Sequence, residues 1–138
     1  MISFARTART GAASLLLIAT ALPFSPALAD DGFPFGMEMQ LDVGRQPGSK
    51  RIPNLEIGDA GEVVLELWCK GGKGQFSVAG NTVIFVAGAM QNRPCPPDRA
   101  QADDELIAAL TEAGTWKRQD DLVSFVGAKT LRFRINTN

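Results

Sequence analysis

The sequence of 138 residues contains no histidine and no tyrosine, and only two cysteines. Histidine is the usual general base of enzymes at neutral pH and the commonest metal ligand, so its absence removes the usual members of acid–base, triad and zinc sites. Two carboxylate pairs remain, Asp103 with Asp104 and Asp120 with Asp121. The first pair lies near the start of an expected helix and the second in an expected turn, and acidic residues are common at both places without any catalytic role. We therefore predict a protein that is not an enzyme, with no catalytic residue, no metal site and no cofactor.

Charge and hydrophobicity exclude two further classes. The 14 basic residues face 15 acidic ones, for a net charge of −1, which argues against nucleic acid as a partner. The apolar run at 11–22 is shorter than the roughly 20 residues of a membrane span. It belongs instead to a leader, because two arginines precede it and a small-x-small site ending at Ala29 follows. We predict that residues 1–29 are a signal peptide cleaved after Ala29, and that the mature chain is periplasmic or secreted, with no membrane span.

The remaining residues, 30–138, have the length of one domain. Residues 30–36 alternate Gly and Pro with Phe and predict a loose N-terminal arm before a domain at 37–138. Alternation of apolar and polar residues predicts strands. These are expected at 37–43, 53–57, 62–69, 75–79, 82–87, 115–119, 122–126 and 130–135. One helix is expected at 99–113, where apolar residues recur at helical spacing after Asp98 as N-cap.

Three local patterns carry further predictions. The acidic helix residues Asp103, Asp104, Glu105 and Glu112 are expected to lie in water rather than to bind a metal. Residues 70–74 (KGGKG) lack the spacing of a phosphate-binding loop and predict a mobile turn. Residues 83–86 are apolar on both faces, which predicts a well-covered central strand.

The two cysteines, Cys69 and Cys95, are expected to form a disulfide, because the chain carries an export signal. A zinc site would need further ligands, and the CxxC spacing of redox catalysis is absent. Closing a loop of this length stabilises a fold by about 3–4 kcal/mol in the chain-entropy model.

The stretch between the cysteines resembles the META/HslJ family, whose pattern runs roughly GCN-x-x-x-G-x-[YF]-x-x-x-G-x-x-[LV]-x-[FI] before M-x-x-x-x-C. The matching residues are Cys69, Gly74, Phe76, Gly80, Val83, Phe85, Met90 and Cys95. The sequence departs from the pattern at residues 68–70, which read WCK instead of GCN, so no role of that asparagine is carried over. The resemblance implies a compact α+β domain, a curved antiparallel sheet or partial barrel with one helix. It also implies a secreted or lipid-anchored bacterial setting with links to envelope stress and drug tolerance, and it brings no catalytic residues.

Two functional hypotheses follow. The first is a monomeric, non-catalytic domain that binds a protein partner in the envelope, with contacts at Val64 and Trp68 and in the basic loop at Lys50 and Arg51. Core packing of Trp68 and a solvated connection at the loop are the alternatives for these residues.

The second hypothesis is a carrier of a small apolar ligand in a cavity between the sheet and the helix. The small residues Ala102, Ala109 and Ala113 would provide the room, facing Phe85 and Phe125.

Overall fold

In a computed structural model of the protein, the structure describes residue 11 and residues 32–43 and 49–137. The expected signal peptide at 1–29, with its cleavage site after Ala29, lies almost entirely outside these residues and stays a prediction. Residues 44–48 of the basic loop also lie outside them. No helix in the described part of the chain has both the length and the apolar character of a membrane span.

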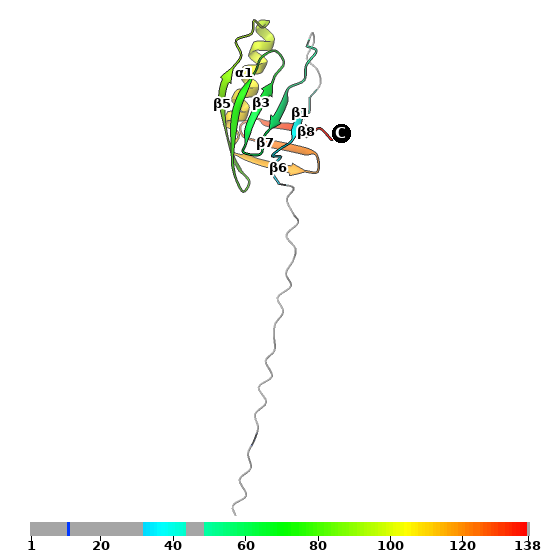
Figure 1. Cartoon of the computed structure of the whole chain (residues 1–138), viewed down its shortest axis with the longest axis vertical. Coiled ribbons are helices and arrows are strands. Elements are labelled where there is room, and N and C mark those ends of the chain that lie inside the picture. The colour runs from blue at the N-terminus through cyan, green and yellow to red at the C-terminus, as the bar shows by residue number, and fades with distance from the viewer. Residues whose placement is uncertain (1–10, 12–31, 44–48, 138) are drawn as a thin grey trace, which may run out of the picture.

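Eight antiparallel strands form a closed barrel in which each strand pairs with its neighbours in the sequence and β8 pairs back with β1 (Figure 1). The elements are β1 (Glu38–Leu41), β2 (Asn54–Ile57), β3 (Glu62–Glu66), β4 (Gly71–Ala79), β5 (Thr82–Met90), α1 (Pro97–Glu112), β6 (Thr115–Gln119), β7 (Leu122–Val126) and β8 (Thr130–Ile135). The expectation of a single α+β domain is confirmed. The sheet goes further than a partial barrel, because its first and last strands meet.

Alternating side chains explain why these segments become barrel strands. In β3, Val63 and Leu65 are buried while the residues between and beside them are exposed. Phenylalanines from four strands meet inside the barrel, and the rings of Phe76 and Phe125 stack with centroids 5.4 Å apart. Each fully buried apolar side chain of this size stabilises the fold by about 1.5–3 kcal/mol. Side chains therefore fill the barrel interior, as expected for eight strands. The four phenylalanines are Phe76, Phe85, Phe125 and Phe133.

The described part of the N-terminal arm differs from the loose segment that its composition predicts. Phe33 is only 8% exposed and belongs to the hydrophobic core. Its ring lies edge-on to Trp116, with centroids 5.2 Å apart, and within 5.5 Å of the ring of Phe76. This aromatic packing holds the arm against the barrel.

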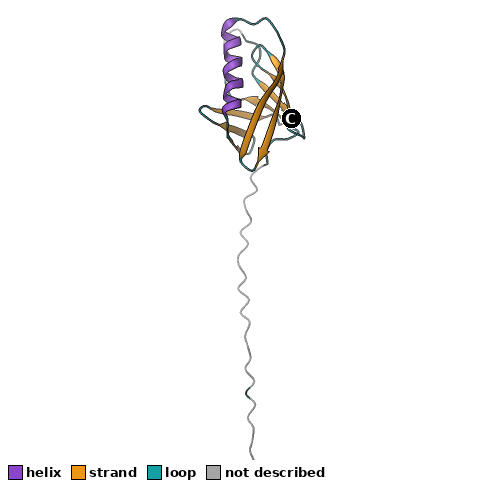
Figure 2. Ribbon diagram, turned by 90° about the vertical axis from the view of Figure 1, so that its left-hand side faces the viewer, coloured by secondary structure: helices purple, strands orange, loops and turns teal. Residues whose placement is uncertain are grey.

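Helix α1 connects β5 to β6. These two strands pair only at Thr82 and Thr115, and α1 contacts both β5 and β8. In Figure 2 the helix stands beside the strands as a single rod. It begins two residues earlier than predicted, at Pro97, with Pro96 as N-cap and no side-chain cap. Asp98 lies in the first turn instead of capping it, because proline suits the first helical position, where no N–H is needed.

The prediction of a mobile turn at 70–74 is wrong, since residues 71–74 belong to strand β4. Glycine is required there by close approach rather than by turn geometry. A Cβ atom on Gly74 would lie 2.5 Å from Cε2 of Phe85 and 3.0 Å from the carbonyl oxygen of Val86. The pairing of β4 with β5 is irregular between Gly72 and Gly74, so the glycines accompany a bulge.

We predict that Gly74→Ala lowers the free energy of unfolding by about 1–3 kcal/mol, because the added methyl group overpacks the Phe85 ring. Gly114→Ala is the matched control, since a Cβ atom there meets nothing within 4 Å. Urea denaturation of both variants measures the difference. Equal stability of Gly74→Ala and the control would contradict this account of the β4 glycines.

Candidate functional site

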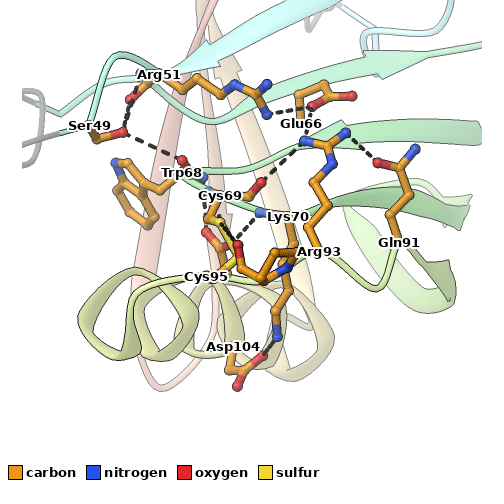
Figure 3. Close-up of a disulfide and its surroundings, with 12 residues drawn as sticks. Ser49, Arg51, Glu66, Trp68, Cys69, Lys70, Gln91, Arg93, Cys95 and Asp104 are labelled. Atoms are coloured by element: carbon orange, nitrogen blue, oxygen red, sulfur yellow. Dashed lines mark hydrogen bonds and ion pairs between the residues drawn. A yellow bond between two sulfur atoms is a disulfide. The ribbon is translucent and has the colours of Figure 1, made fainter.

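The disulfide links the turn after β3 to the segment that leads into α1. Cys69 and Cys95 are bonded, with Cα atoms 6.0 Å apart, as the sequence predicts (Figure 3). The turn itself is closed by the N–H of Leu67, which donates to the carbonyl oxygen of Lys70 at 2.8 Å. The bond therefore fixes the start of α1 next to one end of the barrel.

A buried carboxylate joins the same two elements from the helix side. Asp103 is 0% exposed. Its Oδ1 accepts the backbone N–H of Trp68 at 2.9 Å, and its Oδ2 accepts those of Cys69 at 3.2 Å and Lys70 at 2.7 Å. Hydrogen bonds to an ionised acceptor are roughly twice as strong as neutral ones. Asp103 thus satisfies three consecutive backbone donors of the turn.

The prediction that Asp103 lies in water is therefore wrong, whereas Asp104, Glu105 and Glu112 are exposed as expected. The turn presents three N–H groups to the helix, and buried backbone donors need a partner. A signal was present in the sequence, because Asp103 lies three residues before Leu106 and therefore shares its helix face. A lone acidic residue on an apolar stripe indicates a buried hydrogen-bonded group.

Two arginine side chains lie on the outer side of this turn. Arg93 donates to the carbonyl oxygen of Cys69 at 3.2 Å and lies 3.8 Å from Glu66. Glu66 also pairs with Arg51 at 3.4 Å. Figure 3 shows the two arginines converging on this one carboxylate. The groups are half-exposed, so each pair contributes at most about 1 kcal/mol.

The structure separates the residues expected to form one contact surface. Val64 points outward from β3 and is 42% exposed. Trp68 is half-buried, packs against the hydrophobic core and lies between Ser49 and α1 (Figure 3). Arg51 reaches the outer face of β3 through Glu66, while Lys50 is exposed. The outer face of β3 therefore carries Val64 with Arg51 beside it, and Trp68 lies elsewhere.

The outer face of β5 is open, contrary to the prediction of a strand covered on both faces. Ile84 and Val86 are 58% and 60% exposed. They lie on one face of the strand, opposite Ser77 and Gln75 of β4. The buried partners of the run, Val83 and Phe85, account for its second apolar face. Sequence alone does not distinguish this arrangement from a covered strand, because both give a continuous apolar run.

A groove of about 270 Å³ lies between α1 and the strands β1 and β8. Ala102 and Ala109 line it, as the hypothesis of a cavity between sheet and helix requires. Ala113, Phe85 and Phe125 do not line it, since all three belong to the buried core. The groove therefore lies outside the barrel. Its full lining is Leu41, Asp42, Val43, Trp68, Ala102, Glu105, Leu106, Ala109, Lys129, Thr130, Leu131 and Arg132.

A larger depression of about 760 Å³ crosses β1 and β8, and polar residues line most of it. Its arginine, Arg134, is engaged by Asp121 at 3.0 Å and by Asp42 at 3.7 Å. The hydrogen bond and charge of Asp121, followed by the charge of Asp42, raise the pKa of Arg134. Because these groups already satisfy one another, the groove offers the better ligand site.

Residues 32–43 and 49–137 contain no group of three or more histidine, cysteine, aspartate or glutamate side chains placed to hold a metal ion. Both cysteines are in the disulfide. Two features of the described surface bear on the hypotheses drawn from the sequence, the exposed apolar side chains of β3 and β5 and the groove beside α1.

We predict that Asp103→Asn lowers the free energy of unfolding by about 2–3 kcal/mol, because an amide group presents a donor to the N–H groups of the turn. Asp104→Asn is the control, since this neighbour is exposed and only pairs with Lys70 at 3.6 Å. It should change stability by no more than about 0.5 kcal/mol. Thermal and urea unfolding of the oxidised proteins measure both values. An Asp103→Asn protein as stable as the control would contradict the role assigned to this carboxylate.

Comparisons with known proteins agree with this fold. A solved NMR structure of a protein from Burkholderia xenovorans is similar over 86% of this chain and 99% of its own chain, with a TM-score of 0.64 and 15% sequence identity. At that identity the likeness concerns the fold alone. No curated protein matches the sequence. The family model of the META domain matches residues 38–135, from the first strand to the last, and the chain therefore belongs to the META domain family.

Proposed function

We propose that this META-domain protein is a non-catalytic module of the cell envelope that binds a protein partner through the outer face of β3–β5. The observation that carries the proposal is the exposure of three β-branched side chains, Val64, Ile84 and Val86, on that face. Val64 lies on one side of β4 and the β5 pair on the other, with Lys73 and Gln75 of β4 as their register partners. Apolar side chains exposed together on one face of a small domain are common at interaction sites.

The face has the properties of a recognition surface. Ile84 and Val86 lie two residues apart on one rigid strand, so neither needs to become ordered on binding. The polar residues Ser77 and Gln75 lie directly opposite them on β4. Apolar contacts within a polar surround are typical of protein interfaces.

The proposed setting in the envelope rests on the leader pattern of residues 1–29 and on the family resemblance. A contribution to envelope stress tolerance belongs to the same proposal. Among the contacts expected from the sequence, Val64 and Arg51 remain part of the surface, together with the nearby Lys50. Trp68 is assigned to the groove instead, because it packs against the core.

The double variant Ile84→Ser/Val86→Ser should lose the partner while keeping its melting temperature within a few degrees, since both side chains point into solvent. Ala108→Ser, exposed on α1, is the control. Native mass spectrometry of each protein, isolated from the envelope fraction without reductant, measures a bound polypeptide directly. A polypeptide adduct that survives the double substitution would overturn the assignment of this face, and no adduct on the unsubstituted protein would overturn the function.

The groove supports a second candidate function, the carriage of a small apolar ligand. Leu106 and Ala109 form its floor, and half-buried Trp68 lines it, so water in the groove contacts mainly apolar surface. Displacing that water by an apolar ligand is favourable by about 25 cal/mol per Å².

The uncharged dye Nile red should bind saturably to the folded protein with increased fluorescence. Ala102→Phe should abolish the response by filling the groove, whereas Ala108→Phe, on the exposed side of the same helix, should retain it. Absence of a saturable response, or an equal response from both variants, would argue against the groove as the ligand site.

A further inference from the structure

The groove has a helix lip, formed by α1, and a β8 lip, and its charged residues are distributed unevenly between them. We propose that the groove binds a single-chain anionic amphiphile, with the apolar chain along α1 and the anionic oxygens at Lys129 and Arg132. This inference rests on the second candidate function above and adds the chemical class of the ligand.

The floor of the groove defines where the chain lies. Leu106, Ala109 and Leu41 are each at most 5% exposed and belong to packed elements, so the floor is preformed. Trp68 and Leu131 line the groove and are half-buried against the core. A volume of about 270 Å³ lies just below the range of roughly 300–1,000 Å³ for small-molecule sites. This size favours one short chain over a two-chain lipid.

The β8 lip carries two cations, Lys129 and Arg132. Lys129 precedes β8 and Arg132 belongs to it, and both are exposed. Within residues 32–43 and 49–137, neither side chain forms an ion pair or a hydrogen bond. Two unpaired cations beside an apolar floor suit an anionic oxygen group.

The two carboxylates of the groove are already engaged. Asp42 pairs with Arg134 at 3.7 Å, an arginine that it shares with Asp121, so its charge is partly compensated. Glu105, on the helix lip, accepts a hydrogen bond from Gln101 at 3.1 Å. An anionic head therefore gains most at the β8 lip, where it lies opposite Glu105 rather than beside it.

Trp68, which lines the groove, also carries a buried donor. The indole Nε1 of Trp68 is buried and has no hydrogen-bond partner among the described residues. Leaving such a donor unpaired is unfavourable in the free protein.

Trp68 supplies the readout for a test on the full oxidised chain. The only other tryptophan, Trp116, donates its Nε1–H to the carbonyl oxygen of Gly80 and does not line the groove. Fluorescence titrations of the unsubstituted protein and of Trp116→Phe would use three single-chain probes, with alkyl chains of seven or eight carbons, below their micelle concentrations. These are octanoate, octyltrimethylammonium and octyl glucoside. Isothermal calorimetry on the unsubstituted protein gives the same comparison if Trp116→Phe does not fold.

Octanoate should bind at least about tenfold more tightly than octyltrimethylammonium, and added salt should reduce the preference. Lys129→Gln/Arg132→Gln should weaken octanoate binding by roughly fivefold for each lost cation and leave octyl glucoside binding unchanged. Lys73→Gln/Lys117→Gln is the control, because it removes two exposed lysines outside the groove.

The outcomes separate this inference from the candidate function on which it rests. Equal binding of the three probes, or tighter binding of the cation, would overturn the anionic class while leaving an apolar ligand site. Binding of none of the probes would overturn both. An octanoate preference that is equally reduced by the Lys73/Lys117 control would show that net charge, rather than the groove, attracts the anion.

Discussion

The three hydrogen bonds that Asp103 accepts from the backbone of Trp68, Cys69 and Lys70 determine where the helix lies on the barrel. A helix that covers a sheet through a small apolar stripe can slide, because apolar contacts have little directionality. Three bonds to one carboxylate do not tolerate such a shift. The Cys69–Cys95 bond adds a covalent limit at the same turn. Since the groove is the space left between this helix and β8, its shape follows from that fixed position.

The packed interior of the barrel decides which kinds of binding remain. In eight-stranded barrels the interior either fills with side chains or holds one small ligand. Here the ring of Phe76 packs against those of Phe85 and Phe125, and Phe33 adds a further ring from the N-terminal side. A ligand or partner must therefore use the outside of the molecule. The exposed side of β5 and the groove beside α1 are two outer surfaces on which apolar groups remain accessible.

Much of this fold could be predicted from the sequence, because its strands alternate cleanly and its helix has a regular apolar stripe. The strands around Val63 and Phe133 are of this kind. The predictions from the sequence were wrong where a residue contacts a partner far along the chain. Gly74 looks like a turn residue until Phe85 is placed against it, and Asp103 looks solvated until the turn 34 residues earlier presents Cys69 to it. Closure of the barrel is equally non-local, since it pairs Met39 with Ile135.

The candidate site was harder to predict than the fold for a related reason. Val64 and Trp68 are four residues apart, and a continued strand would have placed both on one face. Strand β3 ends at Glu66, however, and the turn that Asp103 holds directs the indole toward α1. The same hydrogen bonds that fix the helix thus remove Trp68 from the outer face and place it in the groove. The hydrogen bonds of Asp103 thus control the positions of both the helix and the Trp68 side chain. The outer face of β3–β5 and the groove are therefore distinct surfaces, and each can be altered by substitution without changing the other.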